Sequence, residues 1–135
     1  MPLTLQWVKD LQFVAEDEKG HGLVVESRKD GIPAGFAPMQ LVLLAAAGCM
    51  AMDMVSILQK KKMDIKGFRV LMDGKRAEEH PKRFTEMNFV YEVKGDIPKE
   101  AVDEAIRLSQ EKYCSVSATI RQGAVMNIES KVVAG

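Results

Sequence analysis

Two cysteines carry the clearest chemical potential of this chain. Cys49 lies in the most apolar stretch, Leu41 to Met52, and Cys114 lies much further along, before a polar Ser115. A thiolate can attack a peroxide oxygen to become a sulfenic acid, which a second thiol converts to a disulfide. The pair therefore predicts thiol redox chemistry, provided that folding brings the two residues together. The alternative is an inert Cys49, because a buried cysteine often serves as a small hydrophobic residue.

Three other kinds of site find less support in the sequence. No C-x-x-C and no paired histidines are present, so no metal site is predicted. The sequence also lacks a glycine-rich phosphate-binding loop. A cysteine hydrolase would need His21 or His80 as a base beside Cys49, and neither histidine stands in a sequence context that indicates this role. The hydrolase stays open as an alternative that mutation of either histidine would test.

The bulk composition is that of an ordinary globular protein. The 135 residues are 47% hydrophobic and 28% charged, with 19 basic and 19 acidic residues. We expect one domain over residues 1–135, and no nucleic-acid partner because there is no basic excess. We also expect a cytoplasmic protein without a membrane partner. The N-terminus has no signal-peptide pattern, and the apolar run is shorter than the roughly 18 residues of a membrane span.

The elements that must position the cysteines follow from hydrophobic periodicity and from proline and glycine positions. In chain order we expect three short strands between residues 4 and 26, a loop to Pro38, a long helix to about Lys62, strands at 65–76 and 84–94, a helix at 98–112, a helical turn at 114–121 and a closing strand at 124–133. This order lacks a βαβ alternation. It therefore predicts an α+β fold with mainly antiparallel sheets.

The long helix that carries Cys49 is apolar on nearly all sides until Asp53. Such a helix should be buried by neighbours all round. One sheet and one other helix would cover only part of it. We therefore expect two copies of the chain to pack these helices together in a homodimer.

With these elements in place, the sequence resembles the OsmC/Ohr family of organic hydroperoxide reductases. The resemblance rests on Pro38-Met39-Gln40-Leu41, an Ala-rich run ending in Gly48-Cys49, a long lysine-ended helix, and Cys114 before Ser115-Val116-Ser117. It implies sheets wrapped around a long buried central helix in an intertwined homodimer, with the site at the subunit interface. It also implies a thiol-dependent peroxidase that needs no cofactor, acts on organic hydroperoxides in the oxidative stress response, and is reduced by a lipoyl or thioredoxin-like dithiol.

The resemblance also implies roles for individual residues. Cys49 matches the cysteine that attacks the peroxide, and Cys114 matches the cysteine that resolves the sulfenic acid. Arg28, or else its neighbour Lys29, stands where the family has an arginine that orients the peroxide and favours the thiolate. These roles make Cys49, Cys114 and Arg28 the expected catalytic residues.

Met39 and Gln40 are the expected substrate-binding residues, and they mark a departure from the family. They occupy the place where typical members carry a glutamate that pairs with the arginine. Gln40 could hold Arg28 by a neutral hydrogen bond, but it cannot act as a carboxylate.

Asp53 follows Cys49 by one helical turn and would raise the thiol pKa if it faced the sulfur. We expect it to turn instead to a lysine or to a backbone donor. The family's proline after the second cysteine is also replaced, by Ser115. These departures leave a second function open, namely a non-enzymatic apolar-ligand binder or redox sensor that retains the fold.

Overall fold

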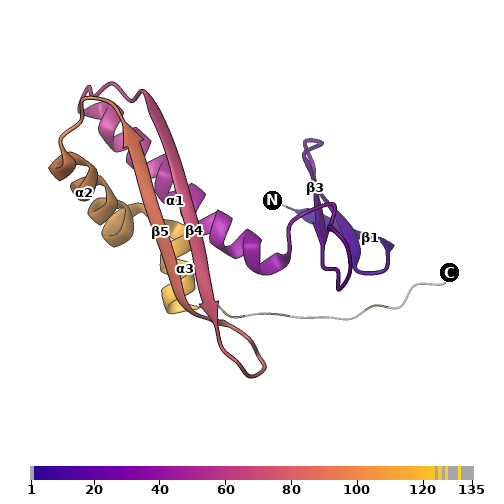
Figure 1. Ribbon diagram of the computed structural model, residues 1–135. Coiled ribbons are helices and arrows are strands. Elements are labelled where there is room, and N and C mark those ends of the chain that lie inside the picture. Colours follow the sequence, from indigo (N-terminus) through magenta and orange to yellow (C-terminus); the bar gives the residue numbers. More distant parts are fainter. Residues whose placement is uncertain (1, 124, 126, 128–130, 132–135) are drawn as a thin grey trace. The chain divides into compact units, whose positions relative to one another are not determined.

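The computed structural model describes residues 2–123, 125, 127 and 131, which fall into two compact units (Figure 1). The first unit comprises Met1–Ala47 and Val70–Tyr91, and the second comprises Gly48–Arg69 and Glu92–Gly135. Helix α1 (Pro38–Lys60) and strands β4 (Gly67–Arg76) and β5 (Phe84–Lys94) contribute residues to both units. The candidate site described below lies within the second unit.

The first unit contains the predicted antiparallel meander. Strands β1 (Leu3–Lys9), β2 (Gln12–Asp17) and β3 (Gly22–Glu26) pair in the order β1-β2-β3. After β3 the chain runs through a loop and returns beside it, where Phe36 forms a parallel bridge with Val25. Gly35 permits this close return, because a Cβ there would lie 2.0 Å from the Val24 carbonyl oxygen.

Helix α1 begins and ends where its sequence predicts. Pro38 occupies the first turn, and Gln40 Oε1 accepts a 2.9 Å hydrogen bond from the Ala37 backbone N–H just before it. Lys60 lies in the last turn, where a cation complements the helix dipole. One face of α1 forms a core stripe made of Leu43, Ala46, Ala47, Met50, Met54 and Leu58.

The single chain buries α1 along one face only, as expected if a second copy covers the rest of the helix. Met52 is 75% exposed, and Val42 and Leu44 are each 37% exposed. By length and composition α1 also meets the criterion for a membrane span, because its most apolar 18-residue window has a mean hydropathy of 2.2, although its uninterrupted apolar run is shorter. The core helix of a soluble protein meets the same criterion, and the buried stripe of α1 is a core of this kind.

The remaining elements follow the predicted order. β4 and β5 form a two-stranded hairpin with strands running in opposite directions, as Figure 1 shows. Helix α2 (Lys99–Leu108) passes into a π-helical turn, Ser109–Tyr113, and α3 (Ser115–Gln122) follows with Cys114 as its N-cap. The sequence predicts one continuous helix to about Lys112. The structure instead ends α2 at Leu108 and continues with the π-helical turn. The predicted strand over residues 124–133 lies almost entirely outside the described residues.

Candidate thiol site

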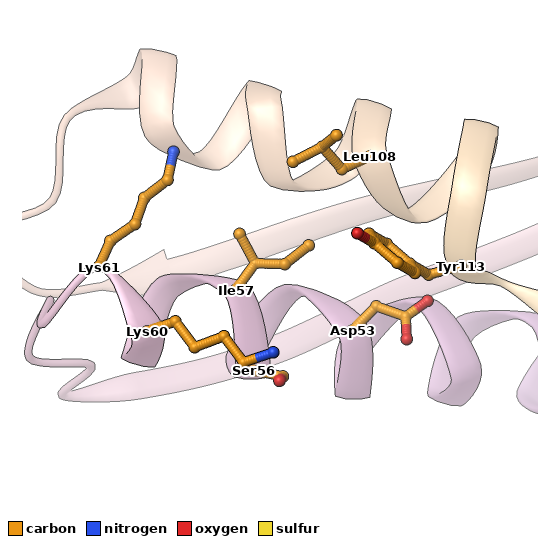
Figure 2. A pocket seen from close by; sticks show the side chains of 7 residues that line it. All are labelled: Asp53, Ser56, Ile57, Lys60, Lys61, Leu108 and Tyr113. Atoms are coloured by element: carbon orange, nitrogen blue, oxygen red, sulfur yellow. The ribbon is translucent and has the colours of Figure 1, made fainter.

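Within the second unit, α1 faces α2 and the π-helical turn across a cavity of about 340 Å³ (Figure 2). Lysines from the end of α1 lie at one end of the cavity and Asp53 lies at the other, with apolar side chains between them. The lining residues are Asp53, Ser56, Ile57, Lys60, Lys61, Leu108 and Tyr113. Lys61 Nζ forms a 2.7 Å ion pair with Glu104 Oε2, which ties the end of α1 to α2.

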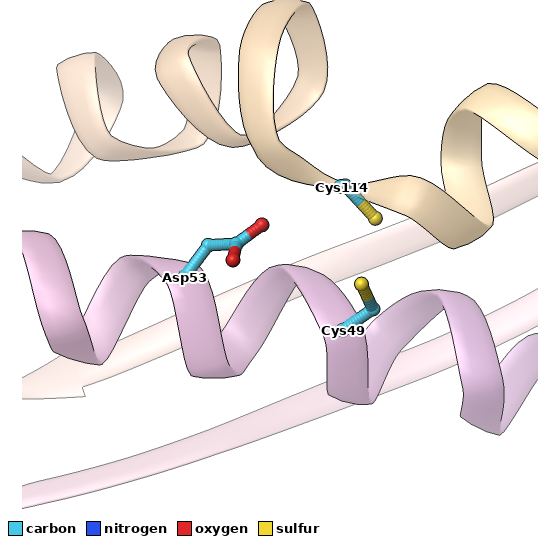
Figure 3. Close-up of side chains that lie close together, drawn as sticks. All are labelled: Cys49, Asp53 and Cys114. Atoms are coloured by element: carbon cyan, nitrogen blue, oxygen red, sulfur yellow. The ribbon is translucent and has the colours of Figure 1, made fainter.

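Beyond Asp53 the same face of α1 carries Cys49. Figure 3 shows its sulfur and that of Cys114 pointing toward one another, with the Asp53 carboxylate beside them. The two sulfurs and one Asp53 carboxylate oxygen all lie within 4.8 Å of one another. Both cysteines are free thiols. Folding therefore brings Cys49 and Cys114 close together, as the predicted thiol redox chemistry requires.

The Cys49 thiol is half-buried and lies against the first turn of α3. The backbone N–H of Val116 lowers the pKa of Cys49 most strongly, and desolvation by burial opposes it. The side chains of Cys114 and Ser115 lower the pKa further, the Ser115 Oγ lying 3.9 Å from the Cys49 sulfur. Unpaired N–H groups at the start of a helix favour an anion there. The net result is a Cys49 pKa below its ordinary value.

Cys114 is more enclosed than Cys49. Only 3% of the residue is exposed, and its Sγ accepts a 3.3 Å hydrogen bond from the Ser117 backbone N–H. The sulfur thus caps α3 in the way that a hydroxyl or carboxylate usually does. The sequence predicts a helical turn that begins at Cys114, and the structure confirms it.

Asp53 does not turn away from the thiols, and our expectation of a lysine or backbone partner is wrong. Its Oδ2 accepts a 2.8 Å hydrogen bond from the hydroxyl of Ser109, a fully buried residue of the π-helical turn. The charge of Asp53 raises the pKa of Cys49, although this is the smallest of the effects on that thiol. No local sequence signal links Asp53 to Ser109, because the contact joins distant parts of the chain.

The chain matches the family description "OsmC-like protein" over residues 29–129. It belongs to the OsmC-like family. This OsmC-like protein is 38% identical to protein YhfA of Escherichia coli K12 over 136 aligned positions, which cover 99% of each chain. The resemblance seen in the sequence is thereby confirmed.

Solved structures show the same fold at lower identity. The OsmC-like protein of Mycoplasma pneumoniae superposes with a TM-score of 0.78 at 17% identity, covering 90% of this chain and 87% of that one. The organic hydroperoxide resistance protein OhrB of Bacillus subtilis superposes with a TM-score of 0.63 at 16% identity, covering 90% of each chain. The predicted α+β fold, with mainly antiparallel sheets and a long central helix, is therefore that of the family.

The remaining predicted site residues of this OsmC-like protein belong to the first unit. Gln40 Oε1 binds the Ala37 N–H and lines a cavity of about 320 Å³, so it does not hold Arg28. Met39 lies half-buried in the first turn of α1. Lys29, the alternative activating cation, is exposed in the loop that follows β3.

Arg28 has a carboxylate partner that sequence reasoning missed. Its Nε lies 4.0 Å from Oε1 of Glu26, which is only 5% exposed, and its guanidinium also donates to the Ile32 carbonyl. Glu26 accepts a further hydrogen bond from the Ala34 backbone N–H. Arg28 of the OsmC-like protein thus pairs with a glutamate of β3, and the residue after Pro38 is a methionine.

Both histidines of the OsmC-like protein also belong to the first unit. His21 Nδ1 lies 2.7 Å from an Asp17 carboxylate oxygen in the turn between β2 and β3. His80 lies in the turn between β4 and β5, before Pro81. The side chains that act on the Cys49 thiol are those of Cys114, Ser115 and Asp53, and they lend no support to a hydrolase.

Proposed function

We propose that this protein is a thiol-dependent peroxidase that reduces organic hydroperoxides. The observation that carries the proposal is the approach of the two free thiols, from α1 and from the N-cap of α3. The Cys49 thiolate attacks the outer oxygen of ROOH, the O–O bond breaks, and the alkoxide leaves and takes a proton to become ROH. The Cys114 thiol then attacks the Cys49 sulfenic acid, which forms a disulfide and releases water.

The assignment of roles follows from the surroundings of each thiol. Cys49 is more accessible than Cys114 and its pKa is lowered, so it is the better first nucleophile. Cys114 is shielded from a bulky peroxide but lies beside the Cys49 sulfur, which suits the resolving step. A cellular dithiol, lipoyl or thioredoxin-like, donates two electrons and two protons to reopen the disulfide.

Arg28 completes the proposed catalytic set, as the family resemblance implies. A guanidinium near the thiolate would stabilise both the attacking sulfur and the leaving alkoxide. The buried Glu26 supports this role because it orients Arg28 in the absence of the family's usual glutamate. Met39 and Gln40 are the proposed substrate-binding residues, as the resemblance implies.

A homodimer is part of the proposal. Large apolar side chains are exposed on this single chain, among them Leu3 at 74%, Trp7 at 67% and Met52 at 75%. Leu3, Leu5 and Trp7 alternate along β1 and so share one exposed face of that strand, an apolar patch of the kind that marks an interaction site. An intertwined partner copy would cover it. Sedimentation equilibrium should give about twice the chain mass of 15.0 kDa, and a monomer at micromolar concentration would contradict this part of the proposal.

The test of the peroxidase is a titration of the reduced protein with cumene hydroperoxide, followed by mass spectrometry. We expect one Cys49–Cys114 disulfide per equivalent of peroxide consumed. Cys114→Ser should stop at a Cys49 sulfenic acid that dimedone traps, and Cys49→Ser should consume no peroxide. Full peroxide consumption by Cys49→Ser in a dithiol-coupled assay would refute the mechanism.

A second function is favoured by one observation, the carboxylate of Asp53 beside the thiols. Because this charge opposes formation of the Cys49 thiolate, it suits a protein that responds slowly to oxidants, as a redox sensor or apolar-ligand binder would. Steady-state assays separate the two functions. Rapid turnover excludes the sensor, whereas stoichiometric oxidation without turnover, together with tight binding of an apolar ligand, would favour it.

A further inference from the structure

The thiol site also brings three atoms of metal-ligand type within 4.8 Å of one another. We propose that the reduced protein binds one thiophilic divalent cation, Zn²⁺ or Cd²⁺, through Cys49 Sγ, Cys114 Sγ and an Asp53 carboxylate oxygen. The sequence offers no metal-ligand spacing, because the three residues come from α1 and from the residue that precedes α3. The cluster arises only on folding.

The distances are compatible with one ion bound to all three atoms. Donors on the same tetrahedral Zn²⁺ lie about 3.5–3.8 Å apart, given Zn–S and Zn–O bonds of about 2.3 and 2.0 Å. The three donor atoms here lie within 4.8 Å of one another. Side-chain rotations that move these donor atoms by about 1 Å would bring all three to bonding distance of one ion. A water molecule would complete a four-coordinate shell.

Each ligand is oriented by a partner that leaves it free to bind a cation. Ser109 donates to Oδ2 of Asp53, which leaves Oδ1 available for the ion. Ser117 N–H donates to the Cys114 sulfur, and Val116 N–H and Ser115 approach the Cys49 sulfur. Hydrogen-bond donors of this kind fix the direction of metal ligands and stabilise their charged forms. The supporting shell of a metal site is therefore already present.

Charge and ligand type favour a thiophilic ion. Two thiolates and a carboxylate held this close would repel one another strongly, and a divalent cation reverses the sign of that interaction. Thiolate ligands select Zn²⁺ and heavier thiophilic ions over Mg²⁺ and Ca²⁺, which prefer oxygen. In a metal site the Asp53 carboxylate would serve as a ligand. In the peroxidase reaction the same carboxylate opposes formation of the Cys49 thiolate.

Metal binding and thiol oxidation would exclude one another. A Cys49–Cys114 disulfide removes two of the three ligands, and a bound ion occupies both sulfurs. The ion should therefore leave when the site is oxidised, and it should protect the thiols while it is bound. The binding step itself requires only the reduced site, so it does not rest on the proposed peroxidase activity.

The test is an anaerobic titration of reduced, metal-free protein with Cd²⁺, followed by thiolate-to-cadmium absorption in the ultraviolet. We expect one equivalent per chain, unaffected by excess Mg²⁺, and no binding by the disulfide form. Cys49→Ser and Cys114→Ser should each lose tight binding. Asp53→Asn should lower the affinity by at least about tenfold, because even the loss of a partner to a metal ligand costs about 10–100-fold.

Matched variants separate ligation from folding. Asp96→Asn removes an exposed aspartate from the loop before α2 and should bind Cd²⁺ as the parent does. Asp53→Cys restores a third ligand and should regain the affinity that Asp53→Asn loses. Parent-like affinity of Asp53→Asn, or tight binding by either single-cysteine variant, would overturn the proposal. Because no peroxide is used, failure here leaves the peroxidase assay unaffected, and the converse also holds.

Discussion

The hydroxyl of Ser109 donates a 2.8 Å hydrogen bond to Oδ2 of Asp53 and so fixes a carboxylate beside two thiols. Ser109 is fully buried, on the π-helical turn that leads to Cys114. This bond joins α1 to the segment that carries the second cysteine. It therefore affects both the packing of the second unit and the charge at the site.

Ser109→Ala should destabilise the protein. The change leaves the Asp53 carboxylate without its hydroxyl donor, and losing one partner of such a buried bond costs about 1–3 kcal/mol. Urea denaturation followed by circular dichroism would measure the loss in the free energy of unfolding. Ser56→Ala, at an exposed position of α1, is the control and should stay within about 0.5 kcal/mol of the parent. Equal stability of the two variants would show that the bond contributes nothing.

Asp53→Asn should make the Cys49 thiol more reactive in metal-free protein. The carboxylate raises the Cys49 pKa, so its removal lowers that pKa and increases the thiolate fraction at neutral pH. Two unit charges 4 Å apart in water interact by about 1 kcal/mol, which corresponds to about a fivefold change. Alkylation by iodoacetamide at pH 7, followed by peptide mass spectrometry, measures this rate. An unchanged or slower rate would contradict the assigned sign.

The pH dependence of alkylation should reveal the lowered pKa of Cys49. Backbone and side-chain donors from the start of α3 lower the Cys49 pKa below that of an ordinary cysteine, so its thiolate persists as the pH falls through the range where an ordinary cysteine is protonated. We expect the midpoint of the Cys49 rate profile to lie below that of the unfolded protein in urea. Identical midpoints in the folded and unfolded protein would refute the shift.

Glu26→Gln should loosen the loop that carries Arg28. The buried Glu26 carboxylate accepts a hydrogen bond from Ala34 N–H and lies near the Arg28 guanidinium, and a neutral amide weakens both interactions. Limited trypsin digestion under native conditions should cleave after Arg28 or Lys29 several-fold faster than in the parent. Glu16→Gln, on β2 at an exposed position, should leave this cleavage rate unchanged.

Local patterns in the sequence were enough to predict the elements of the fold. Alternating residues predicted the three-stranded meander and the long strands, and Pro38 marked the start of α1. These predictions succeed because strand alternation and helix starts depend on residues close together in the chain. The sequence did not predict the π-helical turn, whose Ser109 donates a hydrogen bond to Asp53 of another helix.

The makeup of the candidate site depended instead on contacts between distant residues. Residue types alone identified Cys49 and Cys114 as the chemically capable pair, but only the packing of α3 against α1 brings their sulfurs together. The same packing gives Asp53 the Ser109 hydroxyl as its partner, where we expected a lysine or a backbone donor. Glu26 becomes the partner of Arg28 through the return of the loop after β3. Such contacts join residues far apart in the sequence and form only when the whole chain packs. Patterns of neighbouring residues therefore cannot predict them.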